Sequence, residues 1–130
     1  ILEEGGKLII ASECSEGFGS EAFRNAQKNL VEKGSDSFLE EISQKQMADI
    51  DEWQTEMQLK PMRVGRIQLF SSGLSEDEQS MTGVDSISNI SQAINISIFE
   101  QGSPDVAIIP EGPYLVPFVQ TPLQKNSVSN

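Results

Sequence analysis

A short loop near the start of the chain carries the residue types most able to do chemistry. It follows Leu8–Ala11, an entirely apolar run of the kind found in strands buried on both faces of a parallel sheet. Gly17 and Gly19 lie in the loop just before a helical pattern, where backbone N–H groups can bind an anion. Open α/β sheets bind ligands beyond the carboxyl end of a strand, so this loop is the first candidate for a ligand site.

The detailed composition of the loop argues against a phosphate site. It lacks the Lys-Ser/Thr pair of a P-loop and the third glycine of the dinucleotide fingerprint. Three carboxylates that would repel phosphate surround it: Glu13, Glu16 and Glu21. The residue types therefore favour a tight strand-to-helix turn, in which Gly17 and Gly19 supply the backbone conformation, over an anion site.

Cys14 and its acidic neighbours give two further candidates. A reactive thiolate needs nearby positive charge, but two glutamates and no Lys or Arg are close to Cys14 in sequence. We therefore expect a packed or loop cysteine. Glu13 and Glu16 are a possible carboxylate pair for a divalent cation, but two carboxylates are too few for a calcium site made by protein alone.

The overall composition excludes several classes of function. The chain of 130 residues has no histidine, which rules out a Ser-His or Cys-His site within it and removes the commonest metal ligand. A net charge of −11 with nine scattered basic residues disfavours nucleic acid as a partner. No apolar run approaches the ~20 residues of a membrane helix, and a single cysteine suits a reducing compartment, so we expect a cytoplasmic protein.

The hydrophobic pattern predicts strands alternating with helices. Strands are expected at 7–11, 64–70 and 106–109. Helices are expected at 20–33 and at 46–60, the latter stopped by Pro61, with a shorter helix between them that a Ser37–Glu40 capping box begins. Two more are expected at 75–83, begun by a Ser75–Glu78 capping box, and at 86–102, capped by Ser86. This order predicts an α/β fold: a small parallel sheet with helices on both faces, in a Rossmann-like three-layer arrangement.

The ends of the sequence bear on domain organisation. Ile1–Glu4 followed by Gly5-Gly6 is typical of the last turn of a helix closed by glycine, so we expect the first strand and helix of the fold to lie upstream. Residues 1–119 then form one α/β domain, and residues 120–130 form a polar tail.

Trp53 is the only tryptophan in the chain. It continues a stripe at i, i+3, i+4 spacing that contains Met47, Ile50 and Met57. A stripe of this kind usually marks the buried face of a helix, so we expect Trp53 to pack in the core.

Several motifs recur in one order along the chain. Gly5-Gly6 and a strand precede an Ala-x-Glu-Cys-x-Glu-Gly-x-Gly loop that ends at Gly19, and Asp51–Gln54 follows. The strand at 67–74 and an Ile-Ile-Pro-Glu-Gly-Pro run at 108–113 complete the set. In this order the chain resembles the C-terminal domain of the nickel-dependent lactate racemase family, with Ser12 as a one-residue departure from the family's loop.

The resemblance implies a two-domain enzyme that racemises or epimerises 2-hydroxy acids of the lactate type in a cleft between its domains. Its nickel pincer nucleotide, a nicotinate-type cofactor tethered to a lysine, takes and returns a hydride. The catalytic histidines, the nickel ligand and the tethering lysine belong to the N-terminal domain, which is this chain's implied partner. The chain alone is therefore expected to be inactive and to hold no metal, and Trp53, Gly17 and Gly19 are the residues implied to face cofactor or substrate.

Two other classes of function remain open. The chain is alternatively a non-catalytic α/β module whose exposed apolar residues dock another chain, or a free-standing binder of small molecules that uses the Gly17–Gly19 loop. The sequence upstream discriminates the enzyme from the interaction module, and calorimetry with small anions tests the free-standing binder.

Overall fold

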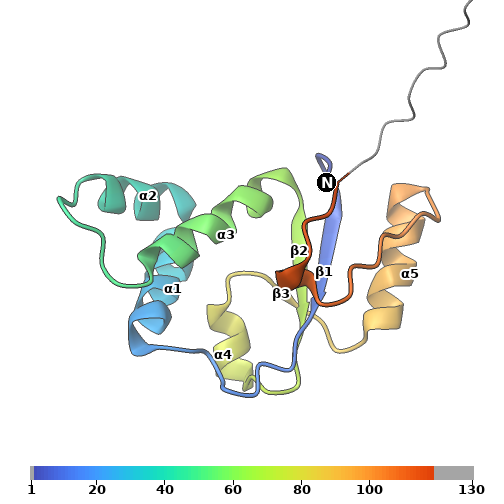
Figure 1. Cartoon of the computed structure of the whole chain (residues 1–130), viewed down its shortest axis with the longest axis horizontal. Coiled ribbons are helices and arrows are strands. Elements are labelled where there is room, and N and C mark those ends of the chain that lie inside the picture. Colours follow the sequence, from blue (N-terminus) through green and yellow to red (C-terminus); the bar gives the residue numbers. More distant parts are fainter. Residues whose placement is uncertain (1, 119–130) are drawn as a thin grey trace, which may run out of the picture.

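The fold is built around a small parallel sheet (Figure 1). The computed structural model describes residues 2–118, so residues 1 and 119–130, including the expected polar tail, lie outside the described part. The strands lie in the order β1-β2-β3 and all pairs are parallel. Their bounds are Lys7–Ala11 for β1, Arg66–Phe70 for β2 and Asp85–Ser86 for β3.

Helices cover both faces of this sheet, which confirms the predicted fold class. Three helices pack together on one side, and α3 also contacts β2. They are α1 (Glu21–Lys33), α2 (Ser35–Ser43) and α3 (Glu52–Val64). On the other side α5 (Ile90–Gln101) lies against β1. The short helix α4 (Glu76–Met81) contacts α1, and a 3-10 turn, η1, spans Gly112–Tyr114. Among residues 2–118 no helix is both long enough and apolar enough to cross a membrane.

Local capping signals explain the helix ends that were predicted well. The Ser20 hydroxyl accepts the N–H of Phe23 at 3.0 Å, so α1 begins where expected. Ser75 and Glu78 form the predicted capping box of α4. Gly102 ends α5 with a φ of 66°, the left-handed conformation that glycine adopts without strain.

Three predicted helix starts are wrong. Helix α2 begins at Ser35 after an uncapped Gly34, so the Ser37–Glu40 box does not form. Helix α5 begins after Asn89, whose side chain accepts the N–H of Gln92 at 2.9 Å, and Ser86 belongs to β3 instead.

The third wrong start is that of α3, which begins at Glu52 and not at residue 46. The Glu52 carboxylate accepts the N–H of Asp49 at 2.7 Å and the ammonium of Lys45 at 2.5 Å. These bonds satisfy the 45–51 segment as turns, which compete with the helix. The helix also continues past Pro61, which lies one turn before its end and accepts the N–H of Gly65 at 3.0 Å.

The strand predictions are correct for β1 and need correction elsewhere. Strand β2 begins at Arg66 and not at Val64, because Val64 still belongs to α3. Gly65 lies between them, where a Cβ would be 2.2 Å from the backbone oxygen of Gly6. No strand forms at 106–109 within the described residues, where Ile108 is 84% exposed. The third strand is instead Asp85–Ser86, too short and too polar to show in a hydrophobic pattern. Glu4 and Gly5 form a turn, which the N–H of Gly6 closes by donating to the carbonyl oxygen of Glu3 at 2.9 Å.

The best-buried cluster lies among the helices and not on the sheet. Leu30, Phe38 and Leu59, one from each of α1, α2 and α3, are buried against one another. By contrast Leu8 is only half-buried and Ile10 is 39% exposed, so the expected burial of β1 on both faces is wrong. Strand β1 pairs with β2 on one edge only in the described part of the chain, so its other edge has no strand partner there.

Candidate functional site

The loop after β1 is a series of tight turns. The N–H of Gly17 donates to the carbonyl oxygen of Cys14 at 2.9 Å. The backbone φ angles are 51° at Cys14, 70° at Gly17 and 84° at Gly19. Positive φ strains a residue that carries a Cβ, so the turn geometry itself explains why glycine stands at 17 and 19. The Cys14 thiol is half-buried and donates to the Ser12 hydroxyl at 3.4 Å.

This loop is held against the loop that follows β2. The N–H of Gly73 and the hydroxyl of Ser71 both donate to the carbonyl oxygen of Glu13, at 2.8 Å and 3.0 Å. The approach is so close that a Cβ on Gly73 would lie 2.4 Å from that oxygen and 2.6 Å from the carbonyl oxygen of Cys14. The carboxyl ends of β1 and β2 therefore form one edge, at the bottom of Figure 1.

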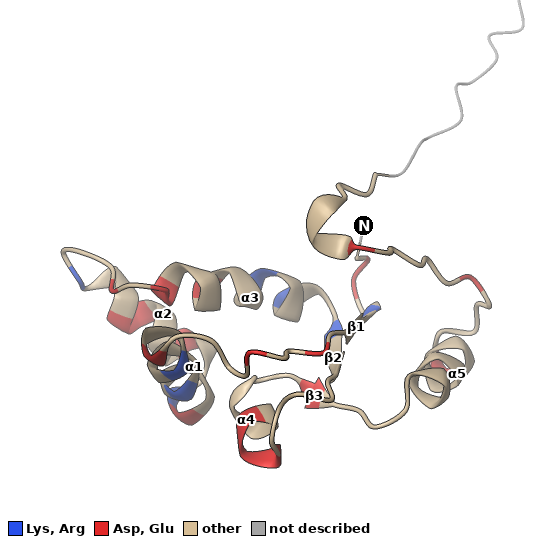
Figure 2. Ribbon diagram, turned by 60° about the horizontal axis from the view of Figure 1, so that its bottom comes forward, with Lys and Arg blue, Asp and Glu red and all other residues tan. Residues whose placement is uncertain are grey.

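Acidic residues lie along this edge, in the loop after β1 and in α4 (Figure 2). Glu78 of α4 is the best-anchored of them: it accepts the N–H of Ser75 and a bond of 2.9 Å from the Arg24 guanidinium. The backbone N–H of Ser75, with help from Arg24, lowers the pKa of Glu78 below its ordinary value. The guanidinium also lies 5.4 Å above the centre of the Phe18 ring, so one cation ties the loop to α4.

The start of α3 lies beside the same loop. The Ser20 hydroxyl donates to Oδ2 of Asp51 at 2.5 Å, and the Gln54 amide donates to Oδ1 at 3.1 Å. Asp51 has a φ of 69°, a strained conformation that these two bonds support. Ser20 follows Gly19 and Asp51 lies two residues before Trp53, so this bond holds the end of the glycine loop against the first turn of α3, which carries Trp53.

Trp53 is 62% exposed, so the prediction that it packs in the core is wrong. The other members of its stripe are also exposed: Met47 at 83%, Ile50 at 78% and Met57 at 49%. Met47 and Ile50 lie before α3 begins, so the stripe is not one helix face, and the four side chains form an exposed apolar set.

The charged groups of this edge do not form a metal site. Among residues 2–118 no three His, Cys, Asp or Glu side chains gather closely enough to hold a metal ion. Glu13 and Glu16, the carboxylate pair considered from the sequence, therefore have no third ligand of these types in the described part of the chain.

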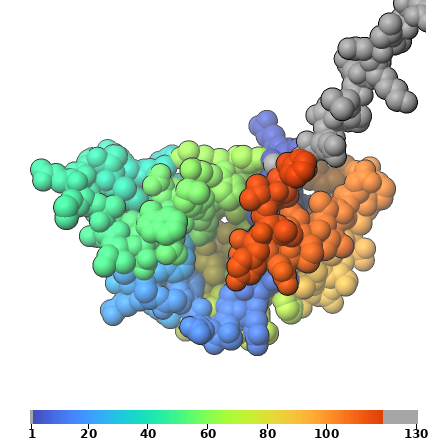
Figure 3. Space-filling view, in the orientation of Figure 1, coloured from blue at the N-terminus to red at the C-terminus, as the bar shows by residue number. Residues whose placement is uncertain are grey.

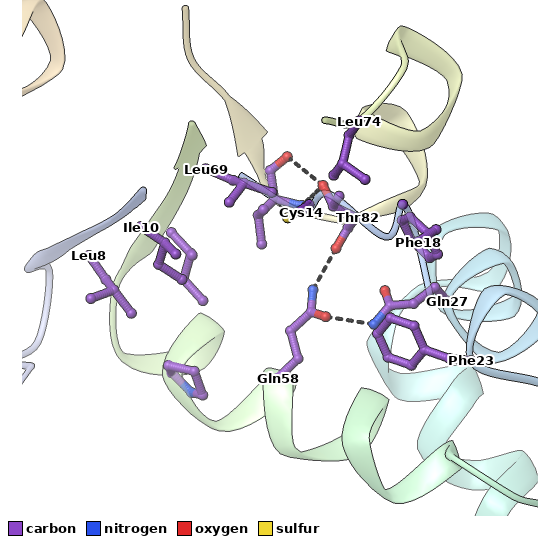
Figure 4. A pocket seen from close by; sticks show the side chains of 14 residues that line it. Leu8, Ile10, Cys14, Phe18, Phe23, Gln27, Gln58, Leu69, Leu74 and Thr82 are labelled. Atoms are coloured by element: carbon purple, nitrogen blue, oxygen red, sulfur yellow. Dashed lines mark hydrogen bonds between the residues drawn. The ribbon is translucent and has the colours of Figure 1, made fainter. Parts of the chain in front are cut away.

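A pocket that the sequence did not predict lies behind the loop, between the sheet and the helices (Figure 4). Its polar wall is a ladder of amides: Gln27 Nε2 donates to Gln58 Oε1 at 2.7 Å, and Gln58 Nε2 donates to the carbonyl oxygen of Thr82 at 2.7 Å. Gln27 is 1% exposed. A sequence signal existed, since Gln27 stands on the same helical face as Phe23 and Leu30 and is the one polar residue at helical spacing there.

Comparison with models of known protein families shows to which family the chain belongs. Residues 1–116 match the lactate racemase C-terminal domain. The chain belongs to this family. The match spans both the glycine loop and Trp53, and it implies an N-terminal partner domain, because the family is defined as a C-terminal domain. A search of curated proteins found no match.

Proposed function

We propose that this chain is the C-terminal domain of a nickel-pincer-nucleotide-dependent racemase or epimerase of 2-hydroxy acids of the lactate type, a cytoplasmic isomerase. The domain closes the active-site cleft against an N-terminal domain and is inactive by itself. The observation that carries the proposal is an exposed tryptophan in the first turn of α3, a turn that the Ser20–Asp51 hydrogen bond holds against the end of the glycine loop, within the part of the chain that matches the family.

The exposed apolar set supports a docking role for this surface. A soluble domain gains by burying tryptophan and methionine, yet Trp53 and Met57 lie on a helix with their side chains in solvent. Figure 3 shows the molecule hollowed between α3 and the segment that ends at residue 118. A second domain that covers α3 would remove these side chains from water and enclose a cleft beside Gly17 and Gly19.

The described residues fit one part of the cofactor and not another. The Trp53 ring offers a flat apolar face, which suits packing against a planar cofactor ring. No three His, Cys, Asp or Glu side chains gather among residues 2–118, and the proposal places the metal mainly with the N-terminal domain. When bound, the cofactor supplies the hydride acceptor of the reaction.

The chain's own contribution is to shape and dry the cleft. Trp53 excludes water from the reacting centre, where electrostatic interactions are then stronger. The bonds from Ser20 and Gln54 to Asp51 fix the first turn of α3 and so fix the position of Trp53. Gly17 and Gly19 allow the loop to turn without a side chain that would fill the cleft.

The test uses the longer protein that contains this chain, assayed for racemisation of L-lactate with a D-lactate-specific readout. We expect Trp53→Ala to lower kcat/KM by roughly 10- to 100-fold, because loose positioning of a bound reactant costs about that much, and Trp53→Phe to retain more activity. Phe99→Ala is the matched control, since Phe99 is 87% exposed on α5, outside the proposed cleft. The isolated chain should show no racemisation.

Three outcomes would sink the proposal: racemisation by the isolated chain, full activity of Trp53→Ala, or an upstream sequence without the histidines that the reaction needs. The last outcome would favour the alternative, a non-catalytic interaction module. The same exposed apolar set supports that alternative, because an interaction module also presents apolar side chains to its partner.

A further inference from the structure

The segment that follows α5, residues 106–118, is apolar, exposed and almost uncharged. Glu111 is its one charged residue, in a chain that has 20 acidic and nine basic residues. Four of its large side chains lie mostly in solvent: Ile108 at 84%, Tyr114 at 85%, Val116 at 89% and Phe118 at 81% exposure. The cores of protein interfaces are depleted of charge and enriched in aromatic side chains, so this composition is typical of an interface.

The segment pairs with no other element of its own domain. Every residue in it is exposed, and in the described part of the chain its two backbone–backbone hydrogen bonds both lie within residues 111–115. It also contains three prolines, which restrict the backbone before any partner binds, so less conformational entropy is lost when a partner orders the segment. The segment is therefore a partly preorganised apolar surface that its own domain leaves in solvent.

This surface lies on one side of the hollow in Figure 3, and α3, which carries the exposed Trp53 and Met57, lies on the other. The segment also lies beside the N-terminal end of the chain in both ribbon views (Figures 1 and 2). A hydrogen bond fixes the start of this arrangement, because Gln101 Nε2 at the end of α5 donates to the carbonyl oxygen of Gly5 at 2.9 Å. A domain joined to the N-terminal end therefore enters beside this segment.

We propose that the domain N-terminal to this chain, which the family match implies, docks into the hollow and covers residues 106–118 as well as α3. This docking presupposes the two-domain arrangement of the proposed function and extends its interface to the opposite side of the hollow. The facing surface of that domain is apolar, because Glu111 is the only charged group in the segment that could pair with a buried ion.

A second copy of the chain is a weaker occupant of the same surface. A domain in the same polypeptide docks intramolecularly, so its effective concentration at the segment is high. Two copies would have to associate against the mutual repulsion of a net charge of −11 on each.

The first experiment places a photo-reactive residue on the segment in the longer protein that contains this chain. With Tyr114 replaced by p-benzoylphenylalanine, illumination should cross-link the segment to a peptide that precedes residue 1, identified by mass spectrometry. The matched control places the same residue at Phe99, an aromatic side chain of nearly equal exposure, 87% against 85%, on α5. The control should give no cross-link to the preceding domain.

The second experiment measures hydrogen exchange of the same segment. The amides of residues 106–118 should exchange at least about tenfold more slowly in the longer protein than in the isolated chain, because docking excludes water from them. The double variant Ile108→Asp, Val116→Asp should abolish this difference, since it places two charges in an apolar interface. Phe99→Asp, which adds a charge at an equally exposed position outside the hollow, should preserve it. Circular dichroism of each variant checks that it is folded.

Three results with folded protein would overturn the proposal. The Tyr114 probe cross-links only to a second copy or within this chain, the segment exchanges equally fast in the longer protein and in the isolated chain, or the double variant keeps its full protection. The outcomes also separate this interface from the proposed activity. A cross-link to the preceding domain in a protein that does not racemise lactate rejects the activity and keeps the interface, and racemisation without the cross-link does the reverse.

Discussion

The contact between the two loops at the carboxyl edge predicts that Gly73→Ala strongly destabilises the chain. A Cβ at this position would lie 2.4 Å from the carbonyl oxygen of Glu13 and 2.6 Å from that of Cys14. Ordinary carbon–oxygen contacts are about 3.3 Å or longer, so one loop must move by roughly 1 Å. Both obstacles are backbone atoms, so no side chain can rotate away to relieve the clash.

The size of the effect follows from what that movement breaks. Two hydrogen bonds end on the Glu13 carbonyl oxygen, from Gly73 and Ser71, and each is worth about 0.5–1.5 kcal/mol. Overpacking adds about 1–3 kcal/mol. Replacing glycine by alanine returns about 0.4–1 kcal/mol through the unfolded chain. We therefore expect the free energy of unfolding to fall by about 2–4 kcal/mol, a large part of the roughly 5–15 kcal/mol typical of a domain.

Urea denaturation followed by circular dichroism measures this change. With a slope of about 2 kcal/mol per molar urea, the midpoint should fall by about 1–2 M. Gly112→Ala is the control, because nothing lies within 4 Å of its Cβ position and its φ is not in the left-handed range. Its midpoint should stay the same or rise slightly. Equal midpoints for the two variants would refute the close approach of the loops.

Two further predictions concern the helices. Phe38→Ala removes a fully buried ring from the cluster with Leu30 and Leu59 and should lower the free energy of unfolding by about 3–5 kcal/mol, whereas Phe99→Ala should change it by less than about 0.5 kcal/mol in the same urea assay. Because the Ser75 N–H and Arg24 lower the pKa of Glu78, its contribution to stability is fully present above the unfolded pKa of about 4.5 and is lost as the pH falls through the folded value. Between pH 6 and pH 3 the midpoint temperature of thermal unfolding should therefore fall less steeply for Glu78→Gln than for the unaltered chain. Parallel curves of midpoint temperature against pH would contradict this origin of the pKa shift.

Signals that act within a few residues could be predicted from the sequence. The Ser75–Glu78 box, the Ser20 cap and the glycine at 102 each satisfy backbone groups of the adjacent turn, so their effect does not depend on the rest of the fold. The parallel pairing of β1 with β2 was also predictable, because the connection between the two strands is long and helical, as parallel strands require.

Features decided by polar side-chain bonds or by pairing between separate elements could not be predicted in this way. Helix α3 starts late because Lys45, Asp49 and Glu52 satisfy one another, and a hydrophobic pattern does not register such polar bonds. Strand β3 is two residues long and exists through its pairing with β2. The Gln27–Gln58 bond joins side chains 31 residues apart, so only its unusual place on an apolar face hinted at it.

Two segments that were predicted to be buried are exposed, and one physical argument applies to both. The stripe around Trp53 and the apolar run at 106–109 both have the composition of buried segments, yet Trp53 and Ile108 are 62% and 84% exposed. Apolar side chains at two separate places on one domain are costly in water unless another surface covers them. The family match implies a partner domain, and a domain that covered α3 would bury Trp53 beside the glycine loop. The exposure of Trp53, where the stripe predicted burial, thus supports a partner surface over α3, as the proposed cleft requires.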